Sequence, residues 1–68
     1  MTSAGQLLVI TTPNGLAAPL ADAIDEAGLA DLAGTVAGEN TIFVAPRQGV
    51  SGARLRDELR THLLEGAA

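Results

Sequence analysis

Short apolar runs separated by Gly and Pro alternate with longer stretches of helical spacing along this chain. Residues 7–12 form the first run, which stops at the turn-forming residues 13–15. Residues 41–45 form another run, and Pro46 follows it. Runs this short and this rich in β-branched residues predict strands, and we expect the first to be buried on both faces.

A helix is predicted over residues 17–28, where apolar residues recur about every 3.6 positions. Pro19 falls in its first turn, where the missing N–H is harmless, and Gly28 is a natural C-terminal stop. The predicted apolar face consists of Leu16, Leu20, Ala23, Ile24 and Ala27.

A second helix is predicted after Ser51, which is a suitable N-cap, and Gly66 ends it. Its apolar face would carry three Leu at four-residue spacing: Leu55, Leu59 and Leu63. On the exposed side, we expect two ion pairs at helical spacing: Arg54 with Glu58, and Asp57 with Arg60.

Residues 34–38 and 41–45 predict an antiparallel hairpin with a tight turn at residues 38–40. The predicted order is therefore β-α-β-β-α, an α+β fold. We expect one small antiparallel or mixed sheet with two helices packed on one face. Residues 7–66 would form this single domain, and the small polar residues 1–6 would be disordered.

Composition limits how such a small domain can be stabilised. Of 68 residues, only 18 are apolar and larger than Ala when Met1 is set aside. In a domain of fewer than about 70–80 residues, a single core rarely supplies more than about 3–5 kcal/mol of stability, so disulfides, a metal or oligomerisation usually add to it. The chain has no Cys, and His62 is its only His, which excludes disulfides and a zinc site. Oligomerisation is the remaining way to bury more apolar surface, so we expect a homo-oligomer.

Charge and hydropathy exclude several classes of protein. The net charge is −4, and residues 1–40 carry five acids and no base. With a single aromatic residue, direct nucleic acid binding by this chain is not expected. No apolar run approaches the 18–20 residues or so of a membrane span, and residues 1–6 lack the basic residue of a secretory signal. We therefore expect a cytoplasmic protein that does not bind membranes.

No catalytic or metal-binding pattern is present. Ser51 has a sufficient role as a cap, and His62 lies between two Leu of a helix, as interface residues do. Residues 34–38 lack the Lys of a phosphate-binding loop, and no cluster has metal-ligand spacing. We expect no enzyme activity, no metal and no cofactor.

The hairpin over residues 34–44 is the informative segment. Glu39 and Asn40 lie at its predicted tip, where such residues suit a turn; alternatively, they face a cationic group. Residues 34–42, GTVAGENTI, resemble the signature GTIAGDDTI of the C-terminal domain of bacterial arginine repressors. Thr12-Pro13, the segment Ala23-Ile24-Asp25 and the closing Leu-rich helix extend the resemblance over residues 7–64.

The resemblance implies a domain that forms trimers, which stack in pairs into hexamers with L-arginine between them. Its implied function is oligomerisation and L-arginine sensing within an arginine-repressor-type transcription regulator of arginine metabolism. A separate winged helix-turn-helix domain binds operator DNA in that family, and we expect this chain to lack it. The family domain also begins with a further strand, so we expect the sheet here to be one strand short or to borrow its edge from a neighbour.

The resemblance also assigns residues to an arginine site. Asp25 matches a helix Asp of the family, while Glu39 and Asn40 stand where the family has paired Asp residues. The backbones of Thr35 and Ala37 would supply neighbouring polar surface. A guanidinium favours planar, charge-matched carboxylates, which fits these residue types.

The sequence also departs from the family pattern. Asn40 lacks the charge of the family's second Asp, and Ala18 stands where the family has a Gln or His. Two alternatives therefore remain open beside arginine sensing or a related small-molecule ligand. One is a ligand-free assembly module with a decayed site, and the other is a small regulatory domain that partners a metabolic enzyme.

Overall fold

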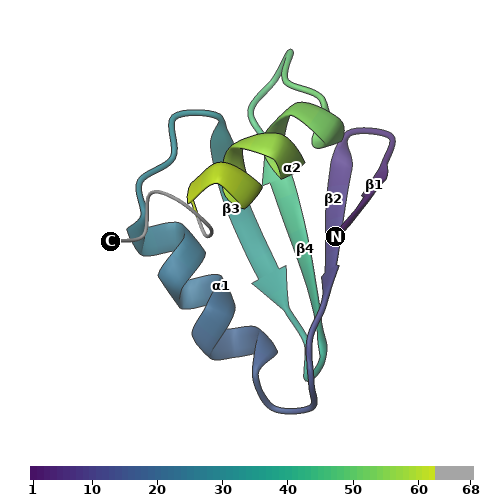
Figure 1. Ribbon diagram of the computed structural model, residues 1–68, viewed down its shortest axis with the longest axis vertical. Helices are drawn as coiled ribbons and strands as arrows, with labels where there is room; N and C mark the ends of the chain where they lie inside the picture. Colours follow the sequence, from purple (N-terminus) through teal and green to yellow (C-terminus); the bar gives the residue numbers. More distant parts are fainter. Residues whose placement is uncertain (63–68) are drawn as a thin grey trace.

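The computed structural model describes residues 1–62, which form a four-stranded sheet and two helices. In chain order these are β1 (Thr2–Ala4), β2 (Leu7–Thr11), α1 (Ala17–Glu26), β3 (Leu32–Ala37), β4 (Thr41–Pro46) and α2 (Gly52–Thr61). The strand order is β1-β2-β4-β3, and each neighbouring pair is antiparallel (Figure 1). The predicted α+β class is confirmed, and the sheet is antiparallel rather than mixed.

The strand β1 corrects two expectations about the N-terminus. Residues 1–6 were expected to be disordered and the sheet to be a strand short, but Thr2–Ala4 pairs with β2. The two strands meet in a tight turn at Gly5, whose φ of 61° suits a residue without Cβ. Polar side chains suit an edge strand, because its backbone supplies the pairing and its side chains remain in water.

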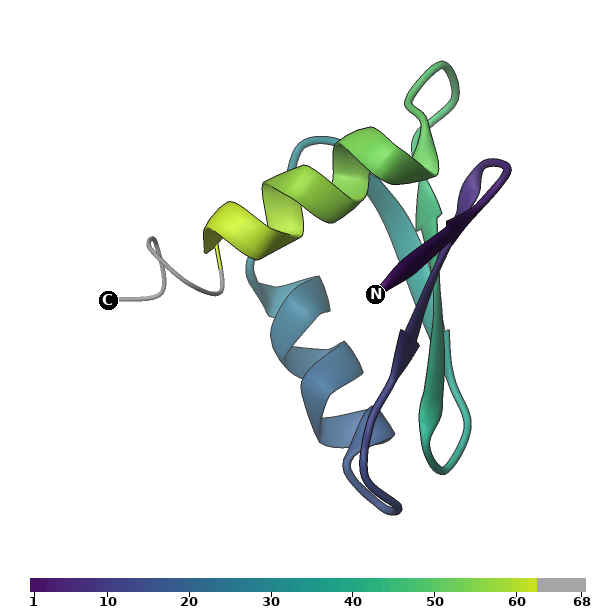
Figure 2. The ribbon, with the colours of Figure 1, turned by 45° about the vertical axis from the view of Figure 1, so that its right-hand side comes forward.

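The strands β2 and β4 alternate between a covered and an open face. Their register pairs Leu8 with Val44 and Ile10 with Ile42, and these four side chains are buried. Leu7 is 39% exposed, so the expectation that this run is buried on both faces is wrong for the single chain. The reason is that both helices lie on the same side of the sheet (Figure 2).

Helix α1 begins and ends close to the predicted positions, and its packed face keeps the predicted Ile24 and Leu20 but turns toward Ala17 and Ala21. Pro19 lies in its first turn, and Gly28 follows it with a φ of 66°. The buried side chains are Ala17, Ala21 and Ile24, whereas Leu16 and Ala23 are exposed. Leu16 is the N-cap and lies outside the helix, and the small Ala side chains face the sheet instead.

Helix α2 begins after Ser51, as predicted, because the Ser51 hydroxyl accepts a hydrogen bond from the Arg54 N–H at 3.0 Å. Gly52 is buried against the start of β2, where a Cβ would lie 2.6 Å from the Leu7 carbonyl oxygen. Leu55 and Leu59 enter the core as expected. The predicted roles of Leu63 and Gly66 lie outside the described residues.

One apolar core fills the space between the helices and the sheet. It consists of Leu8, Ile10, Ala17, Ala21, Ile24, Leu32, Ile42, Val44, Leu55 and Leu59. The strand register assigns the opposite side, the open sheet face, to Thr2, Ala4, Leu7, Val9, Thr11, Gly34, Val36, Thr41, Phe43 and Ala45. None of these ten residues is charged. Within residues 1–62, neither helix has the length and apolar character needed to cross a bilayer.

Candidate functional site

The tip of the β3–β4 hairpin is fixed by backbone hydrogen bonds to the loop between β2 and α1. The Gly38 N–H donates to the Thr41 carbonyl at 2.8 Å and closes the turn. The Thr12 N–H donates to the Asn40 carbonyl at 2.8 Å, and the Gly15 N–H donates to the Glu39 carbonyl at 2.9 Å. The side chains of Glu39 and Asn40 are exposed on this fixed backbone.

Asn40 is oriented by its neighbour in the sequence. The Thr41 hydroxyl donates to Asn40 Oδ1 at 3.1 Å. With its oxygen accepting this bond, the amide retains two N–H donors for a ligand. The hairpin tip therefore offers one carboxylate, from Glu39, beside one amide.

The other predicted carboxylate is held from the sheet. Asp25 lies one residue before the end of α1, and its Oδ2 accepts a hydrogen bond of 3.0 Å from the Thr35 hydroxyl of β3. Thr35 pairs with the buried Val44, so it lies on the helix-covered face of the sheet and can contact α1. The structure thus joins these two sequence-predicted residues through side chains.

Four of the five predicted site residues form two groups. Asp25 and Thr35 make one group, Glu39 and Asn40 make the other, and Ala37 lies between them along β3. Among residues 1–62, no side chain forms a hydrogen bond or ion pair with both the Asp25 and the Glu39 carboxylate. Ala18 is exposed in the first turn of α1.

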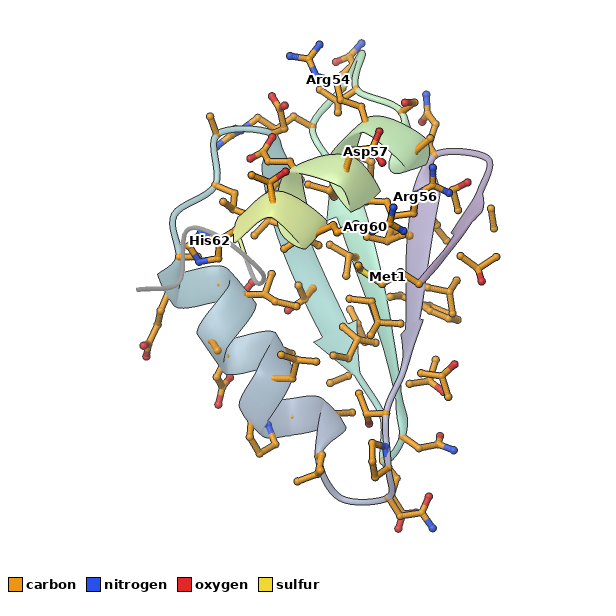
Figure 3. All side chains as sticks on the ribbon, in the orientation of Figure 1. Met1, Arg54, Arg56, Asp57, Arg60 and His62 are labelled. Atoms are coloured by element: carbon orange, nitrogen blue, oxygen red, sulfur yellow. The ribbon has the colours of Figure 1, made fainter. Side chains whose placement is uncertain are left out.

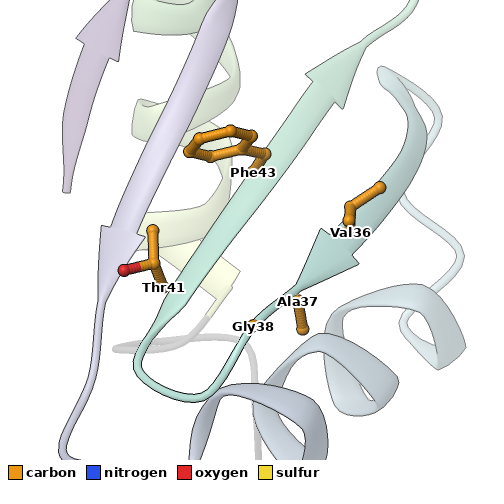
Figure 4. Close-up of a pocket in the computed structure, with 5 residues that line it drawn as sticks. All are labelled: Val36, Ala37, Gly38, Thr41 and Phe43. Atoms are coloured by element: carbon orange, nitrogen blue, oxygen red, sulfur yellow. The ribbon is translucent and has the colours of Figure 1, made fainter.

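A shallow apolar depression lies beside the hairpin tip, and the sequence analysis missed it. It has a volume of about 270 Å³ and is lined by Val36, Ala37, Gly38, Thr41 and Phe43 (Figure 4). Val36, Thr41 and Phe43 belong to the open sheet face. The sequence did contain a signal for this depression. Successive strand residues point to opposite faces of a sheet, and Val36 and Phe43 are apolar residues on the face that the two helices do not cover.

A cluster of charges joins α2 to the connection between α1 and β3. Arg54 Nε lies 3.3 Å from Asp31 Oδ2, and the Arg47 N–H donates to the Asp31 carbonyl at 2.8 Å. A hydrogen bond with Asp31 raises the pKa of Glu58; burial and the Asp31 charge raise it further, while Arg54 opposes the shift. The structure thus pairs Arg54 with this loop rather than with Glu58.

The second predicted ion pair also differs in the structure. Asp57 Oδ1 lies 3.6 Å from Arg56 Nε rather than pairing with Arg60. Figure 3 shows these charged side chains along α2, with Arg54 near its start and Arg60 near its end. Residues 1–62 contain no group of three or more His, Cys, Asp or Glu side chains able to hold a metal ion.

Comparison with known protein families shows which family this fold and hairpin belong to. The family described as "Arginine repressor, C-terminal domain" matches residues 1–61. The chain belongs to the arginine repressor C-terminal domain family. The match includes β1, the strand that the sequence analysis expected to be missing.

A curated relative supports this membership. The arginine repressor of Anaeromyxobacter sp. (strain Fw109-5) is 46% identical over 59 residues, which are 87% of this chain and 37% of that protein. The chain therefore spans little more than a third of the length of the curated relative it matches. As an arginine repressor C-terminal domain, it is a domain related to transcription regulators.

Proposed function

We propose that this arginine repressor C-terminal domain assembles with copies of itself, as a trimer or a hexamer, and senses L-arginine. It would serve as the regulatory part of a cytoplasmic transcription regulator whose DNA-binding domain is a separate unit. Arginine that binds between copies favours the assembled form by mass action, so arginine concentration would set the degree of assembly.

The open sheet face supports the assembly part of this proposal. Val36 and Phe43 are 73% and 49% exposed on a face without charged side chains. Contiguous exposed apolar surface of this kind marks interaction sites in soluble proteins. We propose a second copy of the chain as the partner on this face. Such an interface would bury the exposed apolar side chains of the open sheet face in every copy and so enlarge the small apolar core.

The two carboxylates support the sensing part of the proposal. Asp25 and Glu39 are both exposed, and within residues 1–62 neither forms an ion pair with an Arg side chain. A guanidinium binds carboxylates through paired, charge-assisted hydrogen bonds, while the Asn40 amide can donate to a ligand carboxylate. An amino acid with a cationic side chain matches this combination of acceptors and donors.

The proposal is tested by titrating the full chain with L-arginine in a calorimeter and following assembly by sedimentation velocity. L-citrulline is the matched ligand control, because its ureido group has nearly the shape of a guanidinium without the charge. We expect heat and a shift to larger species with millimolar L-arginine, and neither with L-citrulline. Assembled particles that release no heat with L-arginine would contradict the sensing part.

A ligand-free assembly module is the second candidate, and Asn40 favours it. The hairpin tip carries a single carboxylate, and Ala18 adds no polar group in the first turn of α1. Such a module would form the same particle with and without L-arginine. Sedimentation with and without L-arginine at the same protein concentration therefore separates the two candidates.

A further inference from the structure

Within residues 1–62, Asp25 is the one acid of α1 that the structure fixes through a partner on another element. An exposed Asp on a helix surface ordinarily changes rotamer freely. Here the Thr35 hydroxyl donates to Oδ2 at 3.0 Å, and residues 1–62 form no other side-chain hydrogen bond with this carboxylate. One oxygen is therefore engaged, and Oδ1 keeps its acceptor capacity.

Thr35 is well suited to hold another side chain in place. It lies within β3, is half-buried and pairs with the fully buried Val44 of β4. Its branched Cβ restricts χ1, so the direction of the hydroxyl follows from the position of the strand. The hydrogen bond thus transfers the rigidity of the sheet to a side chain on the helix.

We propose that Thr35 is a positioning residue that holds Asp25 so that Oδ1 faces a cationic ligand. This inference rests on the proposed arginine site, and it assigns the role to the hydroxyl of Thr35 rather than to its backbone. Thr35 precedes Glu39 by four residues on the same hairpin. Its bond to Asp25 therefore also sets where the Asp25 carboxylate lies relative to the backbone of Glu39.

The affinity test uses Thr35→Val, which keeps the branched shape and removes the hydrogen bond, and Thr35→Ser, which keeps a hydroxyl. We expect Thr35→Val to weaken L-arginine binding about three- to tenfold in calorimetry, as the loss of one hydrogen bond predicts. Thr35→Ser should restore most of the affinity. Asp22→Asn, another exposed acid of α1, is the charge control for Asp25→Asn and should bind L-arginine nearly as wild type does.

A double-mutant cycle shows whether Thr35 acts through Asp25. In an Asp25→Asn background, Thr35→Val should cause little further loss, because the carboxylate it positions is already gone. Additive losses would show that Thr35 acts independently and would overturn the inference. Circular dichroism of each variant confirms that the comparison is between folded chains.

A ligand-free spectroscopic readout separates positioning from general stability. Two unequal Hα–Hβ couplings at Asp25 in wild type, averaged toward equal values in Thr35→Val, are the expected NMR result. If wild type binds L-arginine while Thr35→Val keeps both the affinity and the unequal couplings, the inference alone fails. If wild type binds no L-arginine, the proposed function fails and this inference fails with it.

Discussion

At the scale of single residues, the two carboxylates of the candidate site differ in how they are held. A hydroxyl from the sheet fixes Asp25, whereas within residues 1–62 Glu39 is held only through its backbone carbonyl, which accepts from the Gly15 N–H. Side-chain freedom at Glu39 must be lost when a ligand binds, which costs about 1 kcal/mol for a long side chain. Asn40 adds hydrogen-bonding capacity without charge, so Glu39 carries the negative charge of the tip.

Replacing Glu39 by Gln removes this charge and keeps the length of the side chain. We expect the calorimetric affinity for L-arginine to fall about tenfold, in line with the loss of a charge-assisted hydrogen bond at an exposed position. Glu26→Gln is the matched control, because Glu26 is also exposed but lies at the end of α1. Equal affinities in the two variants would mean that Glu39 is only a turn residue.

At the scale of elements, the attachment of α2 depends on contacts that its own sequence does not reveal. Ser51 caps the helix locally, but Arg54 and Glu58 both meet Asp31 from the connection between α1 and β3. Two carboxyl groups in such contact repel when both are ionised, and Arg54 offsets this only in part. The helix is therefore joined to the rest of the domain through a site that can take up a proton.

Stability should respond to pH through Glu58. Its pKa in the folded chain lies above the ordinary value of 4.5, so protonation favours the folded state. The stabilising contribution of protonated Glu58 to the unfolding free energy is fully present below pH 4.5, the ordinary pKa, and is lost as the pH rises through the higher pKa of the folded chain.

Glu58→Gln imitates the protonated side chain and should raise the denaturant midpoint relative to wild type at pH 7. At pH 4 the two midpoints should converge, because wild-type Glu58 is then protonated too. Urea unfolding at fixed protein concentration measures this difference, and Asp57→Asn serves as the exposed neighbour control. A Glu58→Gln midpoint below that of wild type at pH 7 would show that the attraction of the Arg54 charge for ionised Glu58 outweighs the repulsion by Asp31.

Local sequence signals predicted the elements whose boundaries are set locally. Ser51 and Gly28 mark a helix start and a helix end by their own chemistry, and the structure confirms both. β1 has no such signal, since its small polar residues form a strand only because β2 presents an unpaired edge. The sequence also did not predict which side of α1 faces the sheet. Leu16 is larger than Ala17 and Ala21, but the two small Ala side chains allow the helix to pack against the sheet, and Leu16 lies outside the helix as its N-cap.

At the scale of the whole molecule, residues 1–62 form two layers, and no helix among them covers one face of the sheet. Helices α1 and α2 cover one side of the sheet, and the open sheet face lies opposite (Figure 2). Apolar residues at both faces of β2 and β4 were the sequence signal for this arrangement. A single chain with 18 larger apolar side chains leaves Val36 and Phe43 in water.

Val36→Lys places a charge on this face with little effect on the chain's own core, because Val36 is 73% exposed. If the face is buried between copies, an unpaired charge there should weaken assembly by about a hundredfold or more in dissociation constant. Sedimentation velocity over a dilution series measures the shift. Ala23→Lys, on an exposed position of α1, is the control, and an equal effect of both variants would remove the open face from the interface.

The sequence by itself determined the α+β class, the β3–β4 hairpin, the N-cap of α2 and the residue types of the candidate site. These features depend on interactions between residues close together in the sequence, or on the regular spacing of apolar residues in helices and strands. Only the tertiary structure decided that β1 completes the sheet, that Thr35 holds Asp25, and that Arg54 meets Asp31. Those contacts join residues that are far apart in the chain or on different elements, and burial and backbone pairing bring them together without leaving a local signal.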